Sequence, residues 1–173
     1  IIAGVGRDTV NANLGDDVVI ADNGEIDFNV PGVDTDPLSI DLIQSTDLML
    51  GDADVVNAGE GDDIVIGGFG ADVLHGEVGS DLIFGDNGRV DLVAGVVIYA
   101  VTTDTRAATG GDDLITGDDD SVVCDQTHGS NDILFGGMAD DNIDAARGDD
   151  IAFGDNGEVF LKDGLGGNKH SPI

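Results

Sequence analysis

A nine-residue repeat between Ala58 and Gly88 constrains the fold of this chain more than any other feature. The stretch reads AGEGDDIVI, GGFGADVLH and GEVGSDLIF, followed by GDNG. In each unit glycine holds the fourth place, aspartate the sixth and an aliphatic residue the eighth, as at Gly61, Asp63 and Val65. A period of nine is too short for a helical solenoid repeat, which runs to roughly 30 to 45 residues. It fits one tight turn followed by one short strand.

The residue types indicate what such a unit can bind. Glycine at alternate places accepts positive φ and lets the first six residues form a narrow loop. The aspartate sits where this loop meets a strand of three apolar, often β-branched residues. Stacking of the units at about 4.8 Å, the strand spacing of a sheet, would bring each aspartate near its equivalent in the next turn. Carboxylates that close repel one another unless a cation lies between them, and oxygen-only ligands favour Ca²⁺ before Mg²⁺.

The run GEGDDIVIGGFGADVLHGEVGSDLIF is similar to the G-G-x-G-x-D-x-U-x nonapeptide of the RTX, or haemolysin-type, calcium-binding family. The resemblance implies an all-β fold, a parallel β-roll or β-solenoid of nonapeptide turns with β-hairpin-like excursions. In that family the turns alternate between two parallel sheets, and Ca²⁺ is bound in the turns by the aspartate side chain and by loop carbonyls. Several Ca²⁺ ions are therefore the implied cofactors.

The resemblance also implies which residues hold the ions. Side-chain oxygens would come from the aspartates in the sixth place, which are Asp8, Asp17, Asp54, Asp63, Asp72, Asp81, Asp113, Asp132, Asp141 and Asp150. Backbone oxygens, or the room for them, would come from the glycines Gly4, Gly6, Gly59, Gly61, Gly68 and Gly70.

Three D-N-G tripeptides, at 22–24, 86–88 and 155–157, have two interpretations that stay open at this point. Asn-Gly is the favoured type I′ hairpin turn, so the tripeptides could simply reverse the chain into each excursion. In the second interpretation, which is compatible with the first, Asp22, Asp86, Asp118 and Asp155 are ligands of a terminal Ca²⁺. Asp118 opens the acidic cluster 118–120, which could equally be a solvated turn.

Nonapeptide runs alternate with segments that leave the repeat phase. We expect one elongated repeat domain over residues 1–173, with rolls at about 1–24, 49–88, 108–120 and 127–157 and excursions at about 25–48, 89–107, 121–126 and 158–173. EIDF with SIDLIQ, and RVDL with VVIYAV, predict paired strands, the second pair joined through Ala94-Gly95. Ile1-Ile2 have the phase of the eighth and ninth places, so we expect a segment of a longer repetitive protein or a processed subunit that continues a roll across a junction.

The outward strand places are unusually apolar for such a roll. In the family the eighth residue points inward, so the seventh and ninth point outward. Here these outward places hold Val18, Ile20, Ile64, Ile66, Leu82, Phe84, Ile133, Phe135, Ile151 and Phe153. An exposed stripe of these residues would exceed the few hundred Å² that a monomer usually exposes. Either the chain's own excursions cover it or other copies pack there, and the open roll ends also favour end-to-end stacking.

The amino-acid composition excludes several classes of function. The chain has 32 Asp against 4 Glu and a net charge of −30, so self-repulsion should keep it expanded without cations. Six Lys and Arg, spread singly, argue against nucleic-acid or anionic-lipid partners, and the apolar run 92–101 is too short to span a bilayer. One cysteine, Cys124, excludes an internal disulfide, and the three histidines lack metal-like spacing. No motif of an enzyme is found, so we expect no catalytic activity.

Together these features predict an extracellular, secreted or cell-surface structural segment that folds on Ca²⁺. We expect it to form part of a surface fibre, filament or large adhesin, with self-association through the apolar outer sheet faces or the roll ends. The resemblance suggests type I secretion. The alternative is a calcium-dependent secretion and folding module attached to an exported enzyme or toxin.

Overall fold

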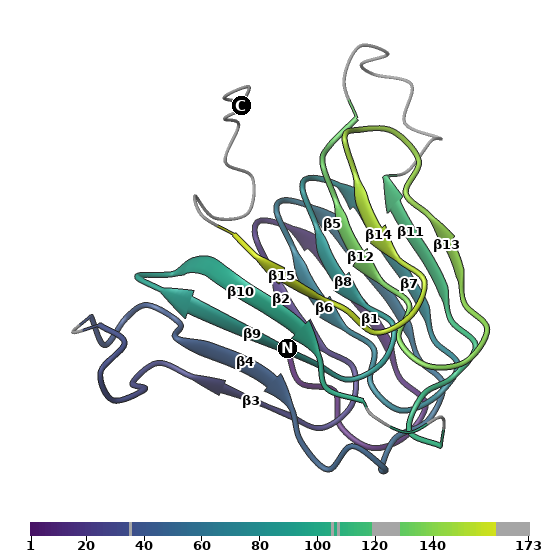
Figure 1. Cartoon of the computed structure of the whole chain (residues 1–173), viewed down its shortest axis with the longest axis horizontal. Helices are drawn as coiled ribbons and strands as arrows, with labels where there is room; N and C mark the ends of the chain where they lie inside the picture. Colours follow the sequence, from purple (N-terminus) through teal and green to yellow (C-terminus); the bar gives the residue numbers. More distant parts are fainter. Residues whose placement is uncertain (35, 105, 107, 119–128, 162–173) are drawn as a thin grey trace.

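The computed structural model describes residues 1–34, 36–104, 106, 108–118 and 129–161, and this described part consists of strands and the turns and loops between them. The strands form three five-stranded sheets (Figure 1). Two of the sheets are parallel and form the walls of a roll, whereas the third is antiparallel. The predicted excursion at 121–126, which contains Cys124, and the part of the last excursion after 161 lie outside the described residues.

We call the two walls of the roll the bare sheet and the covered sheet, for reasons given below. The bare sheet contains, in order, β1 (Thr9–Leu14), β5 (Val55–Glu60), β7 (Val73–Val78), β11 (Leu114–Asp118) and β13 (Asn142–Asp144). The covered sheet contains β2 (Val18–Ile20), β6 (Ile64–Ile66), β8 (Leu82–Phe84), β12 (Ile133–Phe135) and β14 (Ile151–Phe153). The chain alternates between these two sheets, as expected for nonapeptide turns.

The excursions build the third sheet, the excursion sheet. It contains, in order, β3 (Gly24–Asp27), β4 (Leu42–Ser45), β9 (Gly88–Val93), β10 (Val96–Thr102) and β15 (Glu158–Phe160). Both predicted strand pairs are confirmed, since β3 pairs with β4 and β9 with β10. The second pair turns at Ala94-Gly95, with φ of 52° and 74°, which is the left-handed geometry of a type I′ turn.

The interior of the roll is a thin core of small and medium aliphatic side chains. Equivalent places stack in register, so that Val56 lies beside Leu74 and Leu74 beside Ile115. The buried residues of this core come from the eighth and first places: Val10, Val19, Ala21, Val56, Ala58, Val65, Leu74, Ile83, Ile115 and Leu134. The prediction that the eighth place points inward is therefore confirmed.

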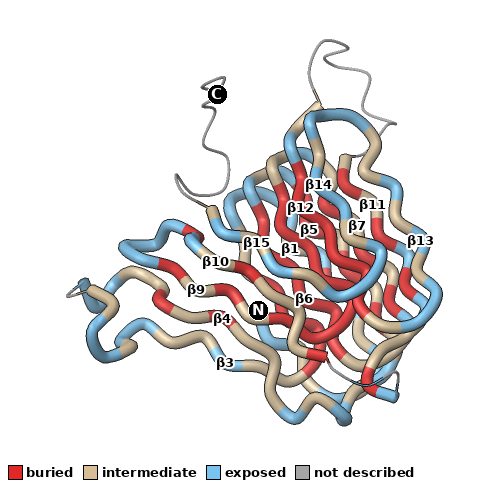
Figure 2. The backbone as a smooth tube through the Cα atoms, viewed as in Figure 1, coloured by how far each residue is buried: buried red, intermediate tan, exposed pale blue. Residues whose placement is uncertain are grey.

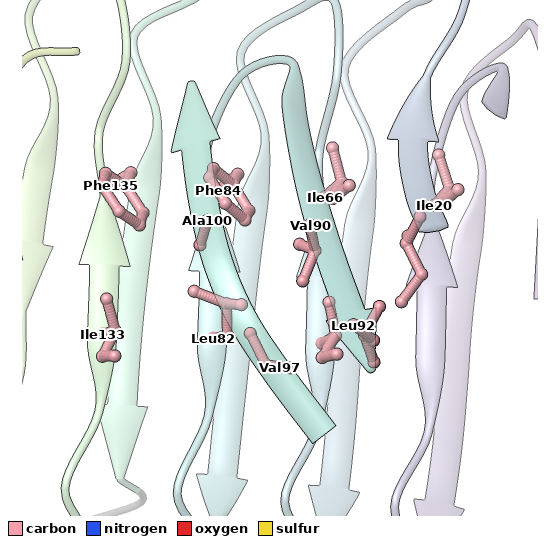
Figure 3. Packing of buried hydrophobic residues seen from close by; sticks show 12 residues of the cluster. Ile20, Ile66, Leu82, Phe84, Val90, Leu92, Val97, Ala100, Ile133 and Phe135 are labelled. Carbon is pink, nitrogen blue, oxygen red and sulfur yellow. The ribbon is translucent and has the colours of Figure 1, made fainter. Parts of the chain in front are cut away.

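A second and bulkier core lies on the opposite face of the covered sheet. The ninth-place side chains Ile20, Ile66, Phe84 and Phe135 are fully buried there against Val90, Leu92, Val97 and Ala100 of the excursion sheet (Figure 3). The rings of Phe84 and Phe135 stack with centroids 4.7 Å apart. The chain's own excursions thus cover most of the apolar stripe, whereas Ile151 in the last strand of the covered sheet remains 43% exposed. In Figure 2 this buried centre contrasts with the exposed loops around it.

The bare sheet has no such cover among the described residues. Its ninth places hold Asn11, Asn57, His75, Thr116 and Asp144, all exposed or half-buried. The Asn57 side-chain amide donates to Oδ1 of Asn11, at 2.8 Å. The ninth places of this outer face are polar, so they can remain in water without a partner sheet, although the seventh places include the apolar Val55, Val73 and Leu114.

The D-N-G tripeptides are not type I′ turns, which corrects one of the two interpretations above. None of their asparagines or glycines has a φ in the left-handed region. Instead, each tripeptide leads the chain from the covered sheet onto the excursion sheet, across the ninth-place side chain that precedes it. A Cβ on Gly88 would lie 2.7 Å from the Phe84 ring, and one on Gly24 would collide with Ile20. Glycine is needed there for space, not for positive φ.

Candidate metal centres

The sixth-place aspartates form two ladders, one along each edge of the roll. The first ladder precedes the strands of the bare sheet and contains Asp8, Asp54, Asp72, Asp113 and Asp141. The second precedes the strands of the covered sheet and contains Asp17, Asp63, Asp81, Asp132 and Asp150. At each step the backbone N–H of one aspartate donates to Oδ1 of the aspartate in the next layer, at 2.7 to 3.0 Å.

The second carboxylate oxygens of the ladders have a different environment. Within the described part of the chain, Oδ2 is buried and lacks a hydrogen-bond partner in Asp17, Asp54, Asp63, Asp72, Asp81, Asp113, Asp132 and Asp141. Buried polar atoms in folded proteins almost always have a partner, because an unpaired one loses its hydration without compensation. A row of unpaired anionic oxygens is the arrangement expected where cations bind.

Five of the eight unpaired oxygens, those of Asp72, Asp81, Asp113, Asp132 and Asp141, lie against a first-place glycine whose missing Cβ leaves room for them. A Cβ on Gly67 would lie 2.5 Å from Oδ2 of Asp72 and would collide with the carbonyl oxygen of Gly85 in the next layer. A Cβ on Gly85 would likewise collide with Oδ2 of Asp113 and the carbonyl oxygen of Gly136. Carboxylate and carbonyl oxygens of successive layers therefore converge in these turns. This is the hard, oxygen-only donor set that suits Ca²⁺.

These first-place glycines were missed by the sequence analysis. They are Gly67, Gly76, Gly85, Gly117 and Gly136, and a Cβ on any of them would meet an Oδ2 atom of the ladders. The sequence contained a sign of them, since glycine and alanine share the first place. The glycines that were predicted, Gly4, Gly6, Gly59, Gly61, Gly68 and Gly70, all have left-handed φ between 94° and 142°. They shape the turns in which the oxygens converge.

Burial makes the ladder carboxylates difficult to ionise without a cation. Desolvation raises the pKa of Asp54 to about 6, those of Asp72 and Asp132 to about 7, that of Asp81 to about 8 and that of Asp113 to about 9. The N–H donated by the preceding layer lowers each pKa, and the neighbouring carboxylates raise it again. A divalent cation between two such groups would replace the protons that they otherwise retain.

The D-N-G aspartates do not join the ladders. Oδ2 of Asp22 accepts the N–H of Phe69 at 2.7 Å, and its Oδ1 is buried without a partner in the described residues. Oδ2 of Asp86 accepts the N–H of Met138, and its Oδ1 accepts that of Gly111 at 2.9 Å. Desolvation raises the pKa of both carboxyls to about 7. Asp22 thus keeps an oxygen for an ion, whereas both oxygens of Asp86 hold the backbone of later turns.

The other two candidates of this group have more open surroundings. Asp155 is exposed. Asp118 is half-buried at the end of β11, its Oδ2 accepts the N–H of Ser130 at 3.2 Å, and desolvation raises the pKa of its carboxyl. The rest of the acidic cluster, 119–120, lies outside the described residues.

Across the described ranges no group of three or more His, Cys, Asp or Glu side chains is arranged to hold a metal. Any ion in the ladders would therefore depend on few carboxylates and on the carbonyls of the turns. A search of the same residues finds no helix long and apolar enough to cross a membrane.

Comparison with known families agrees with this geometry. The chain matches the RTX calcium-binding nonapeptide repeat, in 4 copies, over residues 1–25, 57–89 and 127–161. These ranges cover just over half of the 173 residues. Asp54 and Asp113 fall outside them, yet both hold a place in the first ladder. No curated protein and no solved structure matches the chain.

Proposed function

Because the chain belongs to the RTX calcium-binding nonapeptide repeat family, we propose that it is a calcium-folded structural segment of an extracellular surface or released protein. The repeats mark it as a calcium-binding segment. The proposal that the segment folds on calcium rests on one observation above all, and its role in a fibre, filament or large adhesin is a further proposal that depends on association between copies. Eight ladder aspartates have a buried Oδ2 without a partner in the described residues, and they occupy successive layers along both edges of the roll. We therefore propose that cations bind in the inner layers of both ladders.

Calcium would control folding through linkage. Each candidate site combines oxygens from successive layers, such as Asp72 Oδ2 and the Gly85 carbonyl, so it exists only when the turns are stacked. A cation that binds only the folded state stabilises that state in proportion to the logarithm of its concentration. Extracellular modules bind Ca²⁺ at about 10⁻⁴ to 10⁻³ M. Such a chain would stay unfolded where Ca²⁺ is scarce and fold after export.

The two ends of the roll are complementary, which supports end-to-end association. At one end of the roll lie Asp141 and Asp150. Within the described residues, their backbone N–H groups donate no ladder hydrogen bond. At the other end the ladders finish with the carboxylates of Asp8 and Asp17, which accept no ladder hydrogen bond. Stacking one copy on the next would join donor to acceptor in both ladders. We propose these ends of the roll for self-association, since the excursion sheet already covers most of the apolar face.

We propose no catalytic role for the segment. The ladder carboxylates are engaged in the stacking of turns, and His75 lies half-buried on the outer face of the bare sheet. The alternative function, a secretion and folding module attached to an exported enzyme or toxin, uses the same calcium-dependent folding. It differs in that it needs no association between copies.

A titration of the purified chain with Ca²⁺, from chelator to about 10 mM, would test these proposals. Circular dichroism reports the β content, and light scattering reports particle size in the same samples. A cooperative gain of β signal with growing particles supports the assembling segment, whereas the same gain at constant size favours the folding module. Mg²⁺ at equal concentration serves as the control and should give a weaker response. No gain of β signal with Ca²⁺ would overturn the proposed function.

A further inference from the structure

Asn87, the asparagine of the second D-N-G tripeptide, is buried where the first two excursions return to the roll. Only 2% of its surface is exposed. Its side-chain nitrogen Nδ2 donates to Oδ1 of Asp104 at 3.2 Å and to the carbonyl oxygens of Leu48 and Thr109, both at 3.4 Å. Its backbone N–H donates to Oδ2 of Asp104 at 2.9 Å. The Asn87 amide is therefore enclosed by acceptor oxygens.

This environment suits an amide and disfavours a carboxylate. The partners of Nδ2 are all hydrogen-bond acceptors, and one of them, Asp104, is an acid that is only 3% exposed. A carboxylate in place of the amide would have no N–H to donate, so Leu48 and Thr109 would lose a donor. Two carboxyl groups would also face each other in a buried place, where like charges are least screened. The amide nitrogen of Asn87 is thus essential to this part of the fold.

The residue that follows makes the same amide chemically labile in an unfolded chain. The backbone nitrogen of Gly88 can attack Cγ of Asn87, because glycine has no Cβ to obstruct the approach. A bond forms between this nitrogen and Cγ, and Nδ2 leaves as ammonia with the proton of the Gly88 N–H. Water then opens the resulting succinimide ring to aspartate or isoaspartate. The reaction needs no other reactant, and it turns the amide into a carboxyl group.

The folded chain prevents this attack. The Gly88 N–H donates to Oγ of Ser45 at 3.1 Å, and a Cβ on Gly88 would lie 2.7 Å from the Phe84 ring, so the glycine has little room to move. The Asn87 side chain would have to leave Asp104 to bring Cγ to the nitrogen. Cyclisation therefore requires the chain to open, and its rate falls with the fraction of molecules that are open.

The other two D-N-G tripeptides lack this enclosure. Asn23 is half-buried, and its Nδ2 donates to the carbonyl oxygen of Leu50 at 3.4 Å. Asn156 is exposed, and its Nδ2 donates to the carbonyl oxygen of Asp104 at 2.9 Å and to Sδ of Met138 at 2.9 Å. A carboxylate at Asn156 would stay in contact with water. The same reaction should therefore have little effect on folding there.

We propose that Asn87-Gly88 is a deamidation site of the calcium-free chain and that folding on calcium protects it. The proposal rests on the calcium-dependent folding proposed above. A chain that deamidates at Asn87 before it folds carries a carboxylate opposite Asp104 and folds poorly afterwards. The calcium-free chain thus has a limited time in which it can still fold, and deamidation at Asn156 does not shorten that time.

The first test follows deamidation of the wild-type chain at mildly alkaline pH, in chelator and in saturating Ca²⁺. Peptide mass spectrometry measures conversion at each Asn-Gly pair, and circular dichroism reports folding in the same samples. In chelator we expect similar rates at all three pairs. In Ca²⁺ the rate at Asn87 should fall by about tenfold or more, and the rate at the exposed Asn156 should fall less. Equal rates at Asn87 in folded and unfolded samples would overturn the proposal.

The second test concerns the consequence for folding. Ca²⁺ is added to wild-type chain that has aged in chelator, and size-exclusion chromatography separates refolded from unfolded molecules. The unfolded fraction should be enriched in chain converted at Asn87 but not in chain converted at Asn156. Equal conversion of Asn87 in both fractions would contradict the proposal. A fresh wild type that gains no β signal in Ca²⁺ would instead overturn the proposed function.

Two variants reproduce the products directly. At the Ca²⁺ concentration that folds half of the wild type, the ratio of folded to unfolded chain should be at least about tenfold lower in Asn87→Asp. The matched control, Asn156→Asp, should change this ratio by no more than about twofold, because Asn156 is exposed. Equal ratios in the two variants would mean that the surroundings of Asn87 accept a carboxylate, and the proposal would be wrong.

Discussion

The sequence Phe-Gly-Asp-Asn-Gly occurs twice, at 84–88 and at 153–157, in contrasting surroundings. Both copies lead the chain from the covered sheet to the excursion sheet, from β8 to β9 and from β14 to β15. All five residues of the first copy are buried. In the second copy Gly154, Asp155 and Asn156 are exposed, and Phe153 is only partly buried.

Layers that come later in the sequence account for the difference. Asp86 receives N–H groups from Gly111 and Met138, which lie 25 and 52 residues further on. No described layer covers Asp155, and Asn156 instead donates back to the carbonyl oxygen of Asp104 at 2.9 Å. The motif directs the chain out of the roll in both places, but it becomes a buried polar site only where another turn stacks on it. A buried polar site in this roll therefore needs residues from two stacked layers and cannot be formed by a single repeat.

Truncation of the two phenylalanines should give the largest contrast. The Phe84 ring is fully buried and stacks on Phe135 at 4.7 Å, whereas Phe153 stacks on Phe135 from the open end. We expect Phe84→Ala to cost about 3 to 5 kcal/mol of unfolding free energy, the usual cost of removing a buried ring. Phe153→Ala should cost about 1 to 2 kcal/mol, since Phe153 is only partly buried. Urea unfolding at a fixed, saturating Ca²⁺ concentration measures both.

The same experiment also examines the open end. Equal losses for Phe84→Ala and Phe153→Ala would mean that the C-terminal end of the roll is covered in solution. Repeating it at low and high protein concentration would then separate cover by another copy from cover by the chain itself, because only the former depends on concentration.

The glycine of each motif should show a smaller contrast. A Cβ on Gly85 would collide with Oδ2 of Asp113 and with the Gly136 carbonyl, whereas a Cβ on Gly154 has no neighbour within 4 Å. We expect Gly85→Ala to destabilise the folded chain by about 1 to 3 kcal/mol, as overpacking does, and Gly154→Ala to change stability by less than about 0.5 kcal/mol. Unfolding midpoints in Ca²⁺ measure the pair. If Gly154→Ala lowered the unfolding free energy as much as Gly85→Ala, the inference that each buried site needs two stacked layers would be wrong.

The period of nine predicted what depends on one repeat and its neighbours. It placed Val65 and Leu74 in the core and aligned the aspartates, because stacking in register follows from the repeat itself. It could not show that Phe84 is covered by strands from separate excursions, or that Asp34 meets Ala94. These contacts join segments far apart in the chain that share no repeat.

A longer period in the sequence did contain part of the missing information. The ninth place alternates along the chain between polar and apolar residues. It is Asn11, Asn57 and His75 in units of the bare sheet, and Ile20, Ile66 and Phe84 in units of the covered sheet. A period of two units therefore indicates which wall of the roll needs a cover, although not which segment supplies it.

The smallest contrast is in the pH dependence of the calcium-free chain. Desolvation raises the pKa of Asp86 to about 7. An unfolded carboxyl titrates near 4, so protonation of Asp86 favours the folded state; this contribution is complete below about pH 4 and is lost as the pH rises through about 7. Asn is neutral at all pH values, so Asp86→Asn should resemble the protonated form.

In calcium-depleted samples, the folded fraction from circular dichroism should therefore fall as the pH rises from 4.5 to 8. Several buried carboxyls share this transition, so Asp86→Asn should move its midpoint upward by only roughly a few tenths of a pH unit. Asp155→Asn should leave the midpoint unchanged, because Asp155 is exposed. A downward shift in Asp86→Asn would mean that the charged carboxylate holds the N–H groups of Gly111 and Met138 better than a neutral group does. Equal shifts in both variants would mean that a further layer buries Asp155, and the two copies of the motif would then be equivalent in solution.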